Sequence, residues 1–241
     1  MGGMSGRIET LPDSASLARR VADWMTSAAL AAKGDFRVSL SGGSTPKALF
    51  TLLASDPLIG CFPWPRVSWY WGDERFVPYD HSESNYRMTR ETMLNKAPVP
   101  PGKVHPVPAH GTPEEAASRY EKTLQTPYGA TVLDPARPMF DITLLGLGPD
   151  GHTASLLPGE PVLQERKRWV VAVSHGRPEV RITMTYPVIE SSRRVTFLVA
   201  GKEKAAIFKT VRAGGSDVPA ARVSPVGELV WFVDRAAAGE G

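Results

Sequence analysis

The chain has 241 residues, a net charge of +3 and 42% hydrophobic residues, which is enough to fill the core of one large α/β domain. No apolar run approaches the roughly 20 residues of a membrane span, and the first residues lack the apolar stretch of a secretory signal. The single cysteine, Cys61, excludes an internal disulfide and a cysteine metal cluster. We therefore expect a cytoplasmic protein without membrane or nucleic-acid partners, whose modest positive charge suits an anionic ligand.

Helical patterns and apolar strands alternate along the chain. After a capping Asp13 or Ser14, apolar residues keep helical spacing as far as Gly34. The next helices are expected within 44–55, 83–94, 113–125 and 201–213, and strands at 36–40, 67–71, 140–147, 168–174, 181–186, 194–200 and 229–234. This alternation predicts an α/β fold with a mostly parallel sheet and helices on both faces.

The proline-rich stretch 96–113 is either a linker or a surface loop that contains a short extended segment. The alternation of helices and strands resumes after it, with a capping box of Thr112 and Glu115 around Pro113. We therefore predict a surface loop, and a single domain over residues 1–241. In such sheets ligands bind beyond the carboxyl ends of the strands, so the segments that follow the strands carry the candidate sites.

The first candidate site follows the strand at 36–40, where the chain reads Ser-Gly-Gly-Ser-Thr before a helix. The glycines allow the backbone close to a ligand, and the free amides at the helix start attract an anion. One cap residue and one glycine would satisfy a simple capped turn. The longer run favours a phosphate site, and the contacts expected for it are Gly42, Gly43, Ser44 and Thr45.

Three consecutive charges, Asp73, Glu74 and Arg75, follow the strand at 67–71. The planar guanidinium of Arg75 is suited to binding phosphate. Asp73 can orient that guanidinium or accept a hydrogen bond from a sugar hydroxyl. For Glu74, a solvated turn and a functional role both remain open.

The segment 144–159, LLGLGPDGHTASLLPG, contains the G-x-G-x-x-G pattern of dinucleotide-binding folds. Pro149 lacks an amide donor, and Asp150 places a carboxylate where the pyrophosphate would lie. About 20 residues further on, no acidic residue is present to bind a ribose. The pattern therefore does not predict a dinucleotide site.

The same segment makes better sense as a catalytic turn around His152. Asp150 is near enough to orient the imidazole, and Asp–His pairing is a common way to make a general base. No second histidine or cysteine stands at metal-ligand spacing, so no metal is expected. The other histidines are expected to have local structural roles; they are His81, His105, His110 and His175.

Two basic residues complete the candidate set. Arg181 begins a strand, and Lys204 falls in the first turn of a predicted helix. A cation at the start of a helix opposes the helix dipole, which suggests that Lys204 is placed there to bind an anion. A solvated surface lysine explains the position equally well from sequence alone.

Taken together, the motifs resemble those of a known enzyme family. The segments SLSGGSTPKALF, WGDERFVPYDHSESNYRM, DITLLGLGPDGHTASLLPG, RITMTYPVI and VAGKEKA occur in this order, and the chain resembles the 6-phosphogluconolactonases, in the superfamily of the glucosamine-6-phosphate deaminases. The resemblance implies a modified doubly wound, Rossmann-like three-layer sandwich. It also implies hydrolysis of 6-phospho-D-glucono-1,5-lactone in the oxidative pentose phosphate pathway, without a metal or organic cofactor.

The resemblance also implies site residues. The phosphate site would include Gly43, Ser44, Thr45, Arg75, Arg181 and Lys204, and the catalytic histidine would be His152, beside Asp150. Asp73 and Asn85 match further positions whose roles are less defined. One departure is GRPEVRIT, where the family often has two prolines before the RIT segment, and this bears on the placement of Arg181.

The expected chemistry is attack of water on the lactone carbonyl, with His152 as the base. A lactone is an activated ester, and the chain has no G-x-S-x-G nucleophile motif. Donors for the developing oxyanion are left open between backbone amides of 146–152 and a basic side chain. A monomer acting on a small sugar phosphate is plausible.

Two alternatives differ in function. The deaminases use a Glu just before a Pro after the DGH segment, whereas Leu157 precedes Pro158 here. A sugar-phosphate-sensing domain of a transcriptional regulator would need a helix-turn-helix. The first expected strand begins at residue 36, which leaves room for only one helix before it.

Overall fold

The computed structural model describes residues 6–174, 178–214 and 218–240, so His175 lies outside the described residues. Its main sheet has seven strands in the order β1-β10-β9-β6-β2-β3-β5, and every neighbouring pair is parallel. The strands are β1 (Arg7–Leu11), β2 (Phe36–Leu40), β3 (Val67–Trp71), β5 (Val104–His105), β6 (Ile142–Gly146), β9 (Arg194–Val199) and β10 (Glu228–Asp234).

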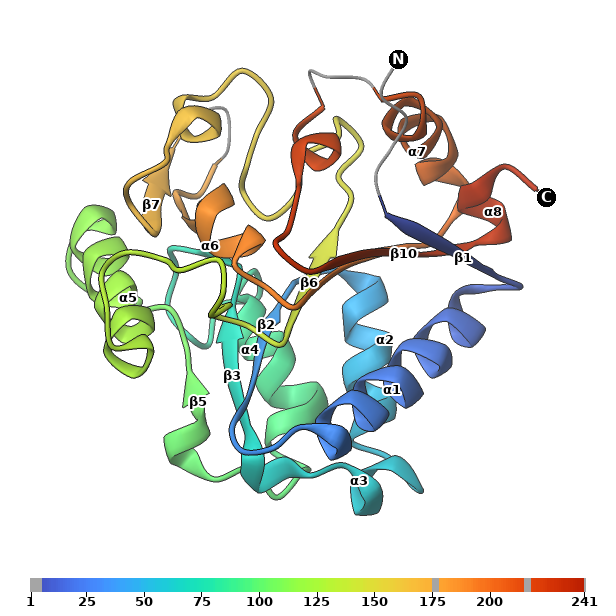
Figure 1. Ribbon diagram of the computed structural model, residues 1–241, viewed down its shortest axis with the longest axis horizontal. Coiled ribbons are helices and arrows are strands. Elements are labelled where there is room, and N and C mark those ends of the chain that lie inside the picture. Colours follow the sequence, from blue (N-terminus) through green and yellow to red (C-terminus); the bar gives the residue numbers. More distant parts are fainter. Residues whose placement is uncertain (1–5, 175–177, 215–217, 241) are drawn as a thin grey trace.

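Helices cover both faces of this sheet, as Figure 1 shows: α1 and α2 lie on one side, and α6 and α7 lie on the other. The helices are α1 (Ser14–Ala31), α2 (Ser44–Leu53), α3 (Leu58–Cys61), α4 (Asn85–Thr89), α5 (Pro113–Tyr128), α6 (Tyr186–Glu190), α7 (Ala205–Arg212) and α8 (Arg235–Ala238). The predicted α/β class, with a mostly parallel sheet between helices, is confirmed. No helix within the described ranges combines the length and apolarity needed to span a membrane.

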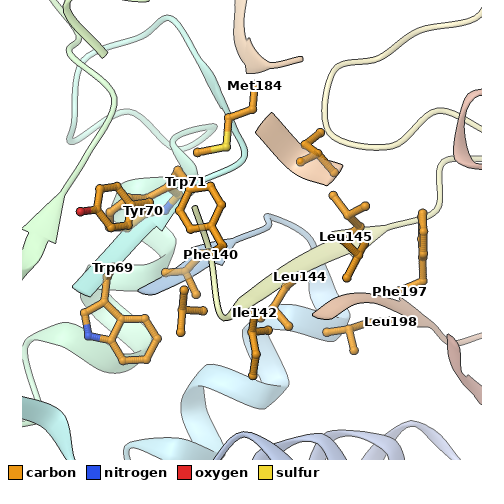
Figure 2. Packing of buried hydrophobic residues seen from close by; sticks show 14 of the residues in the cluster. Trp69, Tyr70, Trp71, Phe140, Ile142, Leu144, Leu145, Met184, Phe197 and Leu198 are labelled. Atoms are coloured by element: carbon orange, nitrogen blue, oxygen red, sulfur yellow. The ribbon is translucent and has the colours of Figure 1, made fainter. Parts of the chain in front are cut away.

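The central strands are apolar on both faces because helices bury both. All five residues of β3 are buried, with Trp69 and Trp71 fully enclosed. Tyr70 points to the opposite face, where its ring lies edge-on to Phe140 with ring centroids 5.6 Å apart (Figure 2). Such continuous apolar runs are typical of parallel strands in covered sheets.

A second, three-stranded sheet has the order β4-β8-β7 and is antiparallel. Its strands are β4 (Asp73–Arg75), β8 (Arg181–Met184) and β7 (Val170–Val173). The backbone N–H of Met184 donates to Gly72 O (2.8 Å), which joins this sheet to the chain leaving β3. The sequence predicted strands at β7 and β8 but not their separate pairing, because strand propensity carries no information about partners.

The prediction that the sheet begins at residue 36 was wrong, because β1 (Arg7–Leu11) precedes α1 and pairs with β10. The residues of β1 are mostly exposed and include Arg7 and Glu9. An edge strand of this kind lacks the apolar run by which the buried strands were recognised. The correction leaves even less of the described chain for a helix-turn-helix ahead of the sheet.

Several local predictions are confirmed. The side chain of Asp13 caps α1 by accepting from Ser16 N, and the capping box of Thr112 and Glu115 begins α5. The proline-rich loop contains the short strand β5. The helix predicted over 83–94 is instead α4 followed by a π-helical segment, Arg90–Leu94.

Candidate functional site

The carboxyl ends of β9, β6, β2 and β3 lie side by side, because these strands are consecutive in the main sheet. The chain continues from β2 to β3 on one side, while β6 flanks β2 on the other, so β2 stands where the strand order reverses. Open α/β sheets bind ligands at such a position. A cavity of about 240 Å³ is found here, and it is lined by Ser41, Gly42, Gly43, Asp73, Arg75, Asn85, Gly146, Leu147, Gly148, Pro149, His152, Ala154, Arg181 and Lys204.

Three cations line this cavity, and two of them face each other across the small sheet. Arg75 in β4 is the direct register partner of Arg181 in β8. Like charges directly opposite one another in a sheet are destabilising, so an anion between them would relieve the repulsion. Lys204 reaches the same cavity from the turn after β9.

The guanidinium of Arg75 is held from one side only. Its Nη1 donates to the Glu83 carbonyl oxygen (2.6 Å) and lies 3.5 Å from the Glu83 carboxylate. Its Nε is buried and has no hydrogen-bond partner among the residues that the structure describes. Donors therefore remain on Arg75 for a ligand in the cavity.

His152 and Asp150 pair as the sequence predicted. The imidazole Nδ1 contacts Asp150 Oδ1, and the backbone N–H of His152 donates to the same oxygen at 3.1 Å. Burial raises the pKa of Asp150, but the hydrogen bonds from His152 outweigh it and leave this pKa below its ordinary value. A Cβ on Gly148 would overlap the imidazole ring, so the glycine lets the ring lie against the backbone.

The loop that carries His152 is fixed to its neighbours by hydrogen bonds. Ser155 Oγ donates to Asp73 Oδ2 (2.7 Å), and Ser155 N donates to Thr183 Oγ1 (3.2 Å). On the other side, Ala220 N donates to the Gly151 carbonyl (3.0 Å). The imidazole is thus positioned relative to both β4 and β8.

The predicted phosphate loop lies partly at the cavity. Gly42 and Gly43 line it, and Gly43 precedes α2. Ser44 and Thr45 are the first residues of α2 and are not among the lining residues. Lys204 ends a short 3-10 turn, Lys202–Lys204, and precedes α7 instead of lying in its first turn.

One wall of the cavity contains two buried acidic residues, Asp73 and Glu74. Asp73 lines the cavity and accepts from Ser155. Glu74 lies behind it, 3% exposed, and burial raises the pKa of Glu74 to about 7 against the opposing hydrogen bonds from the amides of Asn85, Tyr86 and Arg75. The solvated turn that was open for Glu74 is therefore wrong.

Sequence reasoning missed Ser155 and Ala154. Ser155 lies 82 positions from its partner Asp73, and no local pattern signals such a contact. Ala154 lines the cavity with a left-handed backbone, φ 48°, a conformation that residues other than glycine seldom adopt. Strain of this kind gathers at functional sites, but it is visible only in the folded backbone.

Within the described ranges, no three His, Cys, Asp or Glu side chains are grouped so that they could hold a metal ion. At the cavity itself, an imidazole paired with a carboxylate lies beside three cations and glycine-rich backbone.

Comparison with known proteins identifies the family of this chain. The family model described as glucosamine-6-phosphate isomerases/6-phosphogluconolactonase matches residues 12–231. The chain belongs to this family. The resemblance inferred from the motifs is thereby confirmed.

Two curated family members illustrate the similarity. A protein named 6-phosphogluconolactonase 3, chloroplastic, from Arabidopsis thaliana is 42% identical over 212 residues, which are 85% of this chain and 65% of that protein. A protein named 6-phosphogluconolactonase from Nostoc sp. is 39% identical over 246 residues, covering 98% of this chain and 99% of the relative.

The fold is shared as well. The crystal structure of 6-phosphogluconolactonase from Thermotoga maritima superposes with a TM-score of 0.80 at 29% identity, covering 95% of this chain and 100% of that chain. The modified doubly wound arrangement expected from the resemblance is therefore the arrangement of this chain.

Proposed function

We propose that this chain hydrolyses 6-phospho-D-glucono-1,5-lactone to 6-phospho-D-gluconate, the second step of the oxidative pentose phosphate pathway. The observation that carries the proposal is one cavity that joins three cations to a carboxylate-paired imidazole, in a member of this family. The cations match a phosphate group, and the imidazole matches the base that opens an activated ester.

The phosphate end of the substrate binds between Arg75, Arg181 and Lys204. The repulsion between the two opposed arginines is relieved when a dianion lies between them. The amides that precede α2, with Gly42 and Gly43, add donors on the adjacent side. This remote binding energy places C1 of the lactone against the base.

At the reacting end, His152 takes a proton from water as the water oxygen bonds to C1. The bond between C1 and the ring oxygen then breaks, and His152 returns the proton to that ring oxygen. Asp150 keeps the imidazole in the required orientation through its contact with Nδ1. No cofactor or metal takes part in this sequence of steps.

Hydrogen bonds within the 146–152 turn bear on which donors stabilise the developing oxyanion. The amides of Gly148, Gly151 and His152 already donate within the turn, and Pro149 has no N–H. This accounting favours a basic side chain over these three amides as the oxyanion donor.

We further infer that a monomer carries this activity. We further propose that the protein acts in the cytoplasm on a small-molecule substrate, without a nucleic-acid or membrane partner.

A deaminase is the second candidate, because the family includes glucosamine-6-phosphate isomerases. Leu157 stands before Pro158 and is buried, and no Asp or Glu lies between His152 and Pro158. Without a carboxylate there, the ring-opening step of the deaminase lacks the acid that the resemblance assigns to it.

The deciding experiment measures turnover of freshly prepared 6-phosphogluconolactone, coupled to 6-phosphogluconate dehydrogenase, with spontaneous hydrolysis subtracted. Glucosamine 6-phosphate is the competing substrate, assayed for ammonia release. Turnover of the lactone alone is expected. Deamination of the amino sugar with no acceleration of lactone hydrolysis would overturn the proposal.

A further inference from the structure

Glu74 is a buried carboxylate that the chemistry above does not use. It points away from the cavity and accepts four hydrogen bonds. Oε1 accepts from the amides of Arg75 (2.8 Å) and Asn85 (2.7 Å), and Oε2 accepts from Tyr86 N (2.8 Å) and Ser84 Oγ (3.1 Å). A carboxylate with this many donors is fixed in place on both oxygens.

These hydrogen bonds join two segments that form one wall of the cavity. One segment is β4, which carries Asp73 and Arg75, and the other is the start of α4, which carries Asn85. The contacts that cross between them depend on this junction: Arg75 Nη1 donates to Glu83 O (2.6 Å), and Asn85 Nδ2 donates to Asp73 O (3.0 Å).

The opposite side of the cavity leaves little room for the wall to shift. A Cβ on Gly42 would overlap the carboxamide of Asn85, so the Asn85 side chain lies directly against the backbone of the loop after β2. A movement of α4 by a fraction of an ångström would therefore change the distance between the glycine loop and Arg75.

Capping of α4 does not by itself account for a buried acid. Ser84 already serves as the cap, since its Oγ accepts from Arg87 N. Helix α4 has only five residues, so few capping hydrogen bonds are enough to stabilise it. Burying a carboxylate is costly, and a hydroxyl or amide would satisfy a cap at less cost.

We propose that Glu74 is a positioning residue: its carboxylate sets Arg75 and Asn85 at the separation that a phosphorylated substrate requires. The proposal rests on the proposed function for its substrate, and it concerns binding rather than the chemical step. Loss of the junction should weaken the hold on phosphate more than it disturbs His152 and Asp150, because their loop is also held by hydrogen bonds to Thr183 and from Ala220.

Glu74→Gln is the variant that tests this, because it keeps the shape and replaces one acceptor oxygen by a donor. Whichever way the amide turns, an NH₂ group faces a backbone N–H that needs an acceptor. We expect KM for the phosphorylated lactone to rise roughly 10-fold to 100-fold, the scale of a misplaced charged hydrogen bond, with kcat within about 3-fold.

The matched control is Glu121→Gln. Glu121 also accepts from two backbone amides, Trp169 N (2.7 Å) and Val170 N (3.1 Å), and it lies outside the cavity lining. It should leave both KM and kcat at the parental values. Ser84→Ala, which removes one of the four donors to Glu74, should raise KM by less, and it keeps the test possible if Glu74→Gln does not fold.

The inhibition constant for inorganic phosphate gives an independent measurement, and direct titration of phosphate binding gives the same quantity without turnover. Both should weaken in parallel with KM in Glu74→Gln. Parental KM and phosphate affinity in this variant, or an equal loss in Glu121→Gln, would overturn the positioning role. Absence of lactone turnover in the parent protein would instead count against the proposed function, while phosphate titration would still report on Glu74.

Discussion

His152 lies where a small rearrangement would have a large kinetic effect, because its ring is pressed against Gly148 and held by Asp150. Each partner limits a different freedom: the glycine sets how closely the ring approaches the backbone, and the carboxylate sets its rotation. A base that is fixed in this way needs no reorganisation when the substrate binds.

His152→Asn should therefore lower the enzymatic rate by roughly 10²–10⁴, the usual worth of a positioned base, with phosphate affinity unchanged. The measurement is a pH–rate profile from which enzyme-free hydrolysis is subtracted at each pH. If the variant kept nearly full turnover after this subtraction, His152 would not be the base, and Asp73 would be the next group to test.

Arg75 is the residue on which phosphate recognition should depend most, because it lines the cavity directly opposite Arg181. Arg75→Ala should weaken binding of the phosphorylated substrate by roughly 2–3 kcal/mol, the scale of a charged hydrogen bond. Unphosphorylated gluconolactone should be a poor substrate of the parent protein, and its turnover should be little affected by the substitution. Comparison of the two lactones in both proteins measures this, and an equal loss on both would refute the assignment.

At the scale of elements, helix α5 supports the small sheet that carries Arg181. It packs against β7 and β8, and its first turn is set by the capping box of Thr112 and Glu115. A stable α5 therefore supports the small sheet, although the helix itself does not line the cavity.

Thr112→Ala should lower the free energy of unfolding by about 1 kcal/mol, the usual cost of losing an N-cap. The kinetic constants should stay at parental values, because Thr112 lies outside the cavity lining. Urea unfolding and the lactone assay on the same preparation check both statements. An activity loss that exceeds the stability loss would show that α5 acts on the site more directly.

For the whole molecule, we propose a single domain, because the buried apolar residues form one cluster that extends from Leu17 to Ala237. Met184 of the small sheet belongs to this core, where its Sδ lies 3.8 Å from Ser39 Oγ of the main sheet. One cooperative unfolding transition is expected, with coincident circular dichroism and fluorescence curves. Two separated transitions would indicate that the small sheet unfolds on its own.

The absence of a ligand set among the described residues leads to another whole-molecule prediction. Dialysis against a chelator should leave turnover intact, because an imidazole and three cations supply the chemistry. A loss that zinc or magnesium restores would mean that Asp150 and His152 serve as metal ligands.

The class of fold, and most of the residues proposed for the candidate site, could be predicted from the sequence alone. Buried parallel strands such as β3 and β6 are mostly apolar, and helix starts such as those of α1 and α5 have local capping residues. Both signals depend on neighbours in the chain, so they can be recognised without the structure. The Asp150–His152 pair was predictable for the same reason.

Only the tertiary structure decided which distant residues meet. The opposition of Arg75 to Arg181, the bond from Ser155 to Asp73 and the position of the edge strand β1 depend on strand pairing across the sheets. The role of Glu74 also needed the fold, because its four donors become partners only when β4 and α4 meet. Local propensity does not encode such pairing, since it is selected by burial and register over the whole chain.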